Sequence, residues 1–147
     1  MVVEPSRMAT KFLKKFANIK IYHGYFPQCL SNTNENNNFD LAYMVAVDYV
    51  FNKKELLNFL QDVKRFGIKN FLLVSVSIHD RRSLKQSIKY LGKLFLGYLK
   101  IYELGMFWGY SRAPEEFYKA FNSAGFRTIK QGFLDKKVFW IMGVSGE

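Results

Sequence analysis

The first quarter of the chain shows a short apolar run, a segment with helical spacing and a second short run. Residues 1–4 are mostly apolar and end in an acid, Glu4. Ser6 can cap the helix that follows, because residues 8–16 place apolar side chains on one face and lysines on the other. Residues 19–22 alternate between apolar and polar. This order predicts strand, helix and strand.

Longer apolar runs follow. Residues 39–46 and 70–77 are nearly continuous in apolar character, as strands buried on both faces are. Residues 53–66 lie between them and repeat leucine and valine at helical spacing. The polar stretch 31–38 predicts a surface loop that joins elements of one domain. Alternation of strands with helices predicts an α/β fold with a mainly parallel sheet.

The second half of the chain departs from this alternation. Residues 81–102 predict a long, strongly basic helix. Pro114 fits the first turn of another helix at 113–124, which ends before a glycine. Residues 127–134 and 137–144 face each other across a short turn and predict a C-terminal β-hairpin at the sheet edge, with at least one strand antiparallel to the rest.

Composition limits the class of protein. With 147 residues, 49% of them hydrophobic, the chain predicts a single packed domain, residues 1–147. Its apolar runs are too short to span a bilayer and it begins with no signal peptide, so we expect a cytoplasmic protein without a membrane partner. One cysteine, Cys29, excludes an internal disulfide and a cysteine-based zinc site, and no other residue cluster predicts a metal.

The net charge of +10 favours an anionic partner, which could be nucleic acid, an acidic small molecule or a membrane surface. Much of this charge falls in residues 81–100. One interpretation is a solvated helix face, and the alternative is a surface for an anionic substrate or nucleic acid.

Several short motifs and the terminal hairpin occur in an order that is informative when they are taken together. The motifs are Val2-Val3-Glu4-Pro5-Ser6, Asn18-Ile19-Lys20-Ile21-Tyr22-His23-Gly24, Phe39-Asp40-Leu41 and Ala124-Gly125-Phe126. In order and spacing they resemble the class I, Rossmann-like S-adenosylmethionine-dependent methyltransferases, from that family's second strand to its seventh. The resemblance covers nearly the whole chain and implies helices on both faces of the sheet.

The resemblance implies a site for S-adenosylmethionine. In the family an acid at the end of the second strand binds the ribose hydroxyls, and Glu4 holds that position. The alternative is that Glu4 only caps the helix near Ser6. Either Tyr25 or Phe26 would stack on adenine, or else both simply pack. Met44 and Ala46 end the fourth strand of the family, where cofactor and substrate sites meet.

The resemblance also implies a substrate side. Tyr49 follows the fourth strand and lines the pocket or anchors its loop. Residues 81–112 correspond to a substrate-side insertion, in which Trp108, Tyr110 and Arg112 border the pocket. An aromatic ring and an arginine can clamp a planar or phosphorylated acceptor, although Trp108 could equally belong to the core.

Methyl transfer is an in-line displacement that depends mainly on positioning, so the family has no universal catalytic residue. His79 follows the fifth strand of the family and is the best-placed general base, because an ordinary histidine pKa of about 6.5 suits proton transfer near neutrality. The alternative is a surface or capping histidine. His23 is a weaker candidate.

The chain departs from the family at its beginning, where the first strand and the glycine-rich loop are absent. We therefore expect an N-terminally truncated methyltransferase domain, inactive in isolation, with an altered sheet or a partner chain or second copy in place of the missing strand. The first functional hypothesis is methyl transfer to a small molecule. The alternatives are a degenerate, non-catalytic module that binds RNA or a protein through its basic face, and a regulatory subunit completed by a partner.

Overall fold

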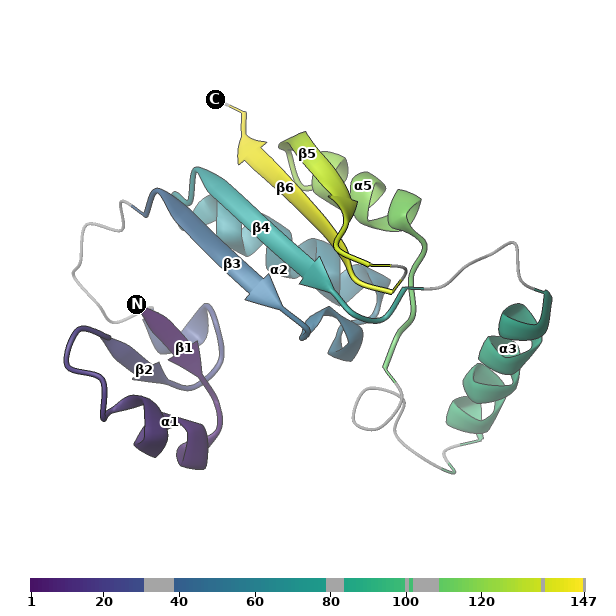
Figure 1. The fold of residues 1–147 in the computed structure, drawn as a ribbon, viewed down its shortest axis with the longest axis horizontal. Coiled ribbons are helices and arrows are strands. Elements are labelled where there is room, and N and C mark those ends of the chain that lie inside the picture. Colours follow the sequence, from purple (N-terminus) through teal and green to yellow (C-terminus); the bar gives the residue numbers. More distant parts are fainter. Residues whose placement is uncertain (31–38, 79–83, 100, 102–108, 136, 147) are drawn as a thin grey trace. The chain divides into compact units, whose positions relative to one another are not determined.

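A computed structural model of the protein describes residues 1–30, 39–78, 84–99, 101, 109–135 and 137–146 (Figure 1). The chain divides into two compact units, Met1–Asn36 and Asn37–Glu147. The division falls within the polar stretch 31–38 that we expected to join elements of one domain. That both units act as a single domain stays a prediction.

The first unit is a parallel strand–helix–strand arrangement, as the sequence predicts. Strand β1 (Val2–Glu4) pairs in parallel with β2 (Ile21–His23), and helix α1 (Arg7–Leu13) connects them. A short 3-10 helix, η1 (Gln28–Leu30), follows. The pairing aligns Glu4 with His23, so the carboxyl ends of both strands lie at one edge of this two-stranded sheet.

The second unit contains a four-stranded sheet with the order β3-β4-β6-β5. Strand β3 (Leu41–Val45) is parallel to β4 (Asn70–Ser75), which in turn is antiparallel to β6 (Phe139–Ser145). Strand β5 (Phe126–Phe133) is antiparallel to β6. The predicted hairpin is confirmed, with β6 inside the sheet and β5 at its edge. The described strands form two sheets, one in each unit. The altered sheet expected of this chain stays a prediction.

Helices α2 (Lys53–Arg65) and α5 (Pro114–Ser123) pack on the same face of the four-stranded sheet (Figure 1). Phe71 of β4 is 1% exposed, and its ring lies 6.0 Å from Phe59 of α2 and 6.0 Å from Phe121 of α5. On the opposite face, Leu41 and Tyr43 are 48% and 68% exposed. The core of this unit therefore lies on the side of the two helices.

Local capping explains where α2 begins. The Oδ1 atom of Asn52 accepts from Glu55 N at 2.9 Å, and the Glu55 carboxylate accepts from Asn52 N at 2.7 Å. This reciprocal pair satisfies two of the backbone donors that a helix leaves open at its start. Gly67 follows the helix with φ of 77°, a conformation that costs glycine little. Both ends of α2 agree with the helix predicted over residues 53–66.

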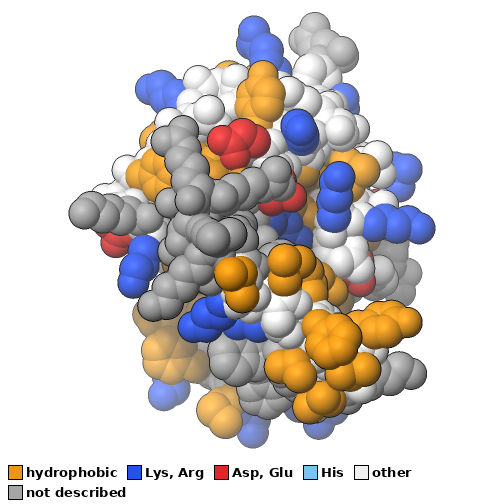
Figure 2. Space-filling view, turned by 90° about the vertical axis from the view of Figure 1, so that its right-hand side faces the viewer, with side chains coloured by type: hydrophobic (Ala, Val, Ile, Leu, Met, Phe, Trp, Pro, Cys, Tyr) orange, Lys and Arg blue, Asp and Glu red, His pale blue; other side chains and the backbone are white. Residues whose placement is uncertain are grey.

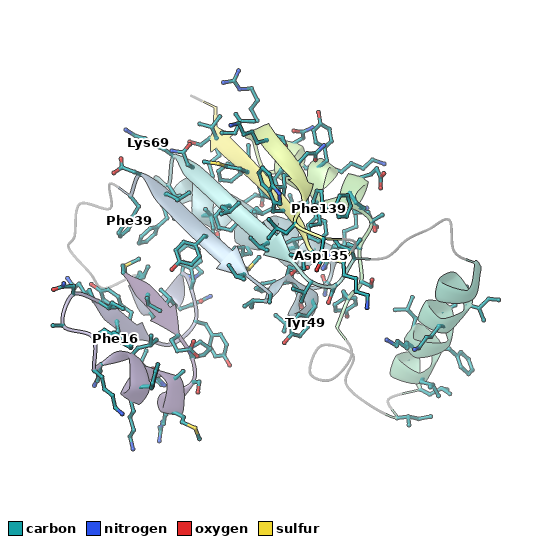
Figure 3. All side chains as sticks on the ribbon, viewed as in Figure 1. Phe16, Phe39, Tyr49, Lys69, Asp135 and Phe139 are labelled. Atoms are coloured by element: carbon teal, nitrogen blue, oxygen red, sulfur yellow. The ribbon has the colours of Figure 1, made fainter. Side chains whose placement is uncertain are left out.

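The basic segment is helical over α3 (Leu84–Tyr98), which lies within the predicted 81–102. Residues 81–83, 100 and 102 of that span lie outside the described residues. Short 3-10 helix η2 (Asp48–Val50) was not predicted and follows β3 directly. Figure 3 shows Tyr49 of η2 at the carboxyl end of β3 and β4, and Lys69 at the opposite end of the sheet. Candidate ligand positions in open α/β folds lie at that carboxyl end.

Candidate functional site

Glu4 ends β1 and turns its carboxylate toward the start of α1. Its Oε1 atom accepts from Ser6 N at 2.7 Å, and the Ser6 hydroxyl accepts from Ala9 N at 3.3 Å. The main-chain carbonyl of Glu4 accepts from Gly24 N at 3.2 Å, which joins the ends of the two strands. The contact of Glu4 with Ser6 N agrees with the helix-capping interpretation. The ribose role stays a prediction.

The segment after β2 lies at the same edge. Gly24 has φ of 141°, and a Cβ there would stand 2.9 Å from Cβ of Cys29, so the turn needs a glycine. Tyr25 is 74% exposed, and Phe26 is half-buried. Tyr25 therefore offers the more accessible ring for stacking. Burial raises the pKa of the Cys29 thiol, which disfavours its reactive thiolate form.

In the second unit the end of β3 turns sharply. Ala46 has a positive φ of 53° and donates from its N–H to the Val74 carbonyl at 2.8 Å. Met44 is only 8% exposed and pairs with the buried Leu73, so its side chain belongs to the core face of the sheet. That Met44 and Ala46 contact a cofactor stays a prediction. The burial of Met44 does not support such a contact.

Tyr49 is held by the segment that precedes α5. Its carbonyl accepts from Tyr110 N at 2.7 Å. Gly109, with φ of 61°, packs so closely that a Cβ at this position would lie 2.6 Å from Cβ of Tyr49. Both Tyr49 and Tyr110 are half-buried. The structure therefore brings together two residues that the sequence assigned to the substrate side, and it shows the contact expected of a loop anchor.

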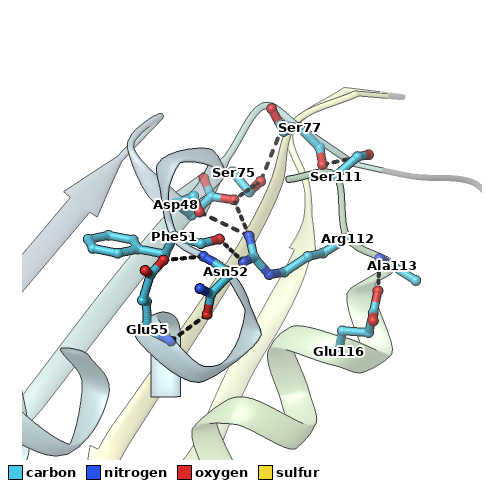
Figure 4. A network of polar contacts seen from close by, with 10 residues as sticks. All are labelled: Asp48, Phe51, Asn52, Glu55, Ser75, Ser77, Ser111, Arg112, Ala113 and Glu116. Carbon is cyan, nitrogen blue, oxygen red and sulfur yellow. Dashed lines mark hydrogen bonds and ion pairs between the residues drawn. The ribbon is translucent and has the colours of Figure 1, made fainter. Parts of the chain in front are cut away.

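Arg112 binds the same turn from inside the protein (Figure 4). Its Nη1 atom donates to the Asp48 carbonyl at 2.9 Å, and Nη2 donates to the carbonyl of Phe51. The guanidinium also lies 4.0 Å from Oδ2 of Asp48, and the Arg112 side chain is 6% exposed. The predicted clamp on an acceptor has no support in these contacts, because the described partners of the guanidinium are protein groups.

A buried carboxylate completes this cluster. Asp48 is fully buried, and its Oδ2 atom accepts from the Ser75 hydroxyl at 2.8 Å. The other oxygen, Oδ1, has no hydrogen-bond partner. Burial raises the pKa of Asp48, while the bond from Ser75 and the charge of Arg112 oppose that shift. We call Asp48, Ser75 and Arg112 the Asp48 cluster.

Sequence reasoning did not find the Asp48 cluster. One signal was present: Ser75 occupies the buried face of an otherwise apolar strand, and a buried hydroxyl needs a polar partner. The pairing with Arg112 spans 64 residues, and local periodicity cannot report it.

Two predicted site residues, His79 and Trp108, lie outside the described residues. Within the described part of the chain, no group of three acidic, histidine or cysteine side chains could hold a metal ion. No helix among those residues is long and apolar enough to cross a membrane.

No family model matches the sequence, and no curated protein matches it. Solved structures do. Methyltransferase CalO6 aligns over 97% of this chain with a TM-score of 0.66 and 14% identity. The chain has the class I methyltransferase fold. Human N-acetylserotonin methyltransferase in complex with SAM aligns over 99% with a TM-score of 0.64 and 16% identity.

A third methyltransferase-fold match, PigF with SAH, covers 99% of the chain at a TM-score of 0.63 and 14% identity. The chain spans only 40% of the human enzyme and 48% of CalO6 and PigF. At these identities the likeness shows the fold. The alignment covers both units of the chain.

Proposed function

We propose that this chain is part of an S-adenosylmethionine-dependent methyltransferase that acts on a small-molecule acceptor in the cytoplasm. The observation that carries the proposal is the methyltransferase fold with an acid, Glu4, at the carboxyl end of β1. Two of the similar structures are complexes with SAM or SAH. No acceptor follows from them for this chain.

The groups at the end of β1 suit the adenosine half of the cofactor. One oxygen of Glu4 holds Ser6 N, and the described residues give its other oxygen no hydrogen bond, so that oxygen is available to a ribose hydroxyl. A charged acceptor there contributes roughly 1.5–3 kcal/mol. In this proposal Tyr25, exposed beside Glu4 at the end of the neighbouring strand, stacks on the adenine ring.

The cofactor supplies a methyl group on a positively charged sulfur. The acceptor's oxygen or nitrogen forms a bond to the methyl carbon as the carbon–sulfur bond breaks and its electrons pass to sulfur. The task of the protein is to orient the acceptor and to remove its proton, which we assign to His79 as general base. Residues 81–112 contribute the acceptor side of the site in this proposal.

Within that side, Tyr49 and Tyr110 present half-buried rings to the acceptor, and Trp108 adds a third aromatic side chain. Arg112 acts through Tyr49, since it holds the backbone of η2 on both sides of this residue. We keep Met44 and Ala46, at the end of β3, as proposed cofactor contacts.

The test is a calorimetric titration of the chain with S-adenosylhomocysteine and, separately, with adenosine. We expect both to bind, and Glu4→Gln to weaken both roughly tenfold or more, in line with the charged hydrogen bond it removes. Glutamine keeps an acceptor for Ser6 N, so the cap is retained. Glu115→Gln, an exposed acid on α5, is the matched control.

Equal affinity in the wild-type chain and Glu4→Gln would remove Glu4 from the site. If neither ligand gives heat, the chain has the methyltransferase fold but does not bind the cofactor. That outcome favours the second candidate, a non-catalytic module that binds RNA or a protein, for which the specific observation is the net charge of +10.

A partner chain or a second copy is part of either proposal. Among the described strands, β3 pairs only with β4 and β1 pairs only with β2, so each has an edge whose backbone groups are not used in a sheet. Leu41, Tyr43 and Val45 are also exposed on one face of β3. We propose that a further strand, from a partner or a second copy, pairs with β3.

A further inference from the structure

Strand β5 forms one edge of the four-stranded sheet, and among the described strands only β6 pairs with it. Between residues 126 and 133, no backbone group bonds to a described residue outside β6. About half of the N–H and C=O groups of such a strand point away from its neighbour. The edge of β5, eight residues long, therefore presents backbone donors and acceptors to an added strand.

A hollow of about 360 Å³ lies between α5 and this edge strand. Figure 1 shows α5 beside β5 at the border of the sheet. Gln131 pairs with the fully buried Ile141, so its side chain is on the face that the helices cover. The volume falls within the range of ligand pockets. We call this hollow the α5–β5 groove, and it is lined by Pro114, Glu115, Tyr118, Lys119 and Gln131.

The other face of β5 is basic. Arg127 and Lys130 pair with residues 144 and 142, which alternate along β6 with the buried Ile141, so both point away from the helices. Both are exposed, and neither side chain makes an ion pair or a hydrogen bond with a described residue. Strand β5 contains no aspartate or glutamate. Figure 2 shows lysine and arginine side chains standing out from one face of the molecule, with fewer acidic side chains between them.

We propose that the edge of β5 binds an extended peptide of a partner protein as a further strand, and that acidic and apolar residues alternate in this peptide. Main-chain hydrogen bonds to an edge strand supply affinity, and pockets for alternate side chains supply specificity. Because successive side chains of a strand point to opposite faces, one set enters the α5–β5 groove and the other set lies beside Arg127 and Lys130.

The chemistry of each face selects one set of peptide side chains. Carboxylates suit the basic face, since opposite charges on neighbouring strands attract. In the groove the ring of Tyr118 is 45% exposed and lies with Pro114, which suits an apolar or aromatic side chain. Glu115 and Lys119 carry opposite charges in the same lining, so the groove itself favours neither sign.

Two other occupants fit the same observations less well. A second copy that paired through its own β5 would bring two basic strands side by side, and like charges on neighbouring strands repel. The irregular register between Thr128 and Lys130 also opposes pairing of identical edges. A nucleic acid would neutralise the basic side chains but would leave the backbone of the edge and the α5–β5 groove without partners.

The experiment is a fluorescence-anisotropy titration of the fluorescein-labelled peptide Glu-Val-Glu-Phe-Glu-Val-Glu with the chain. We expect saturable binding that weakens at high salt. The peptide Glu-Glu-Val-Phe-Val-Glu-Glu has the same composition without the alternation, and it should bind roughly tenfold more weakly. The alternating peptide with lysine in place of each glutamate should not bind.

Variants of the chain test each face separately. Arg127→Glu/Lys130→Glu should weaken binding of the alternating peptide roughly tenfold, because it turns two attractions into repulsions. Tyr118→Ala removes the exposed ring from the groove and should weaken binding roughly fivefold. Circular dichroism of every variant checks that the fold is kept.

Matched variants at other positions provide the controls. Lys53→Glu/Lys54→Glu changes the net charge by the same amount at two exposed positions of α2. Tyr43→Ala removes a 68% exposed tyrosine from β3, the opposite edge of the sheet. Both should bind the alternating peptide like the wild type. This test does not depend on the proposed methyltransferase function.

Absence of binding by the wild-type chain would overturn the proposal, and so would equal affinity for the two peptides of the same composition. An equal loss in Lys53→Glu/Lys54→Glu would show that only net charge matters. A loss in Tyr43→Ala without one in Tyr118→Ala would assign the peptide to β3. Retention of polyuridylate without peptide binding would assign the basic face to nucleic acid.

Discussion

Arg112 donates from Nη1 to the main-chain carbonyl of Asp48 at 2.9 Å, across 64 residues of sequence. With the bond from Nη2 to Phe51, this contact fixes both ends of the turn that carries Tyr49. The segment before α5 is thereby attached to the end of β3, where the site is proposed. The stability of the second unit and the geometry of its proposed ligand end depend on the same side chain.

Replacing this arginine should destabilise the second unit strongly. Arg112→Ala leaves the Asp48 carboxylate buried without its nearest cation and removes the guanidinium donor from the carbonyls of Asp48 and Phe51, at a cost of about 3–5 kcal/mol. Urea unfolding followed by circular dichroism measures the change. Arg127→Ala, at an exposed position of β5, should change the free energy of unfolding by less than about 0.5 kcal/mol. Equal effects of the two substitutions would contradict the buried-pair argument.

The raised pKa of Asp48 has a consequence for acid stability. Because burial raises the folded-state pKa above that of the unfolded chain, the folded state binds this proton more readily. The stabilising contribution is complete below the unfolded pKa of about 4 and is lost as the pH rises through the folded value. Asp48→Asn removes this contribution. The difference in free energy of unfolding, Asp48→Asn minus wild type, should therefore increase between pH 4 and pH 7.

Parallel unfolding titrations of wild type and Asp48→Asn at several pH values test this sign. Glu115→Gln, which changes an exposed acid, should run parallel to the wild type over the same range. If the difference between Asp48→Asn and wild type stayed constant with pH, or fell, the direction assigned to Asp48 would be incorrect.

Gly109 should not tolerate a side chain. Gly109→Ala places a Cβ at 2.6 Å from Cβ of Tyr49 and holds a non-glycine residue at φ of 61°. We expect a loss of roughly 1–3 kcal/mol in unfolding free energy. Gly146→Ala meets nothing within 4 Å and serves as the comparison. If Gly109→Ala left the free energy of unfolding unchanged, the 109–110 segment would be able to move at no energetic cost.

The exposed face of β3 predicts self-association of the chain. Tyr43 is 68% exposed between Leu41 and Val45, so a charge at this position should oppose pairing through β3. Analytical ultracentrifugation should show a concentration-dependent species for the wild type that Tyr43→Glu reduces. Tyr118→Glu, at a 45% exposed position of α5, should leave it unchanged. A wild-type chain that stays monomeric at all concentrations would argue for a different partner.

The elements with strong local signals could be predicted from sequence. Pro114 and Gly125 bracket α5, and Asn52 with Glu55 starts α2, because capping and φ preferences act within a few residues. The resemblance of short motifs also led to the correct fold. In each case the information lies within one element or in the order of elements.

The contacts that organise the proposed site could not be predicted in this way. The Asp48 cluster joins three segments that are distant in sequence, and a charged residue in a loop gives no periodic signal. Arg112 was assigned to a ligand because an arginine beside aromatic residues suits an anion, whereas its described polar contacts are with two backbone carbonyls and the Asp48 carboxylate. Its burial follows from tertiary packing, to which single-sequence patterns are insensitive.

The position of β6 between β4 and β5 bears on how this unit is made. Strand β5 is synthesised before β6, yet among the described strands β6 is its only neighbour in the sheet. During translation β3 and β4 can pair as soon as they emerge, whereas β5 and its helix have no strand to join until Phe139–Ser145 follows. The last strand in sequence is therefore the one that closes the sheet.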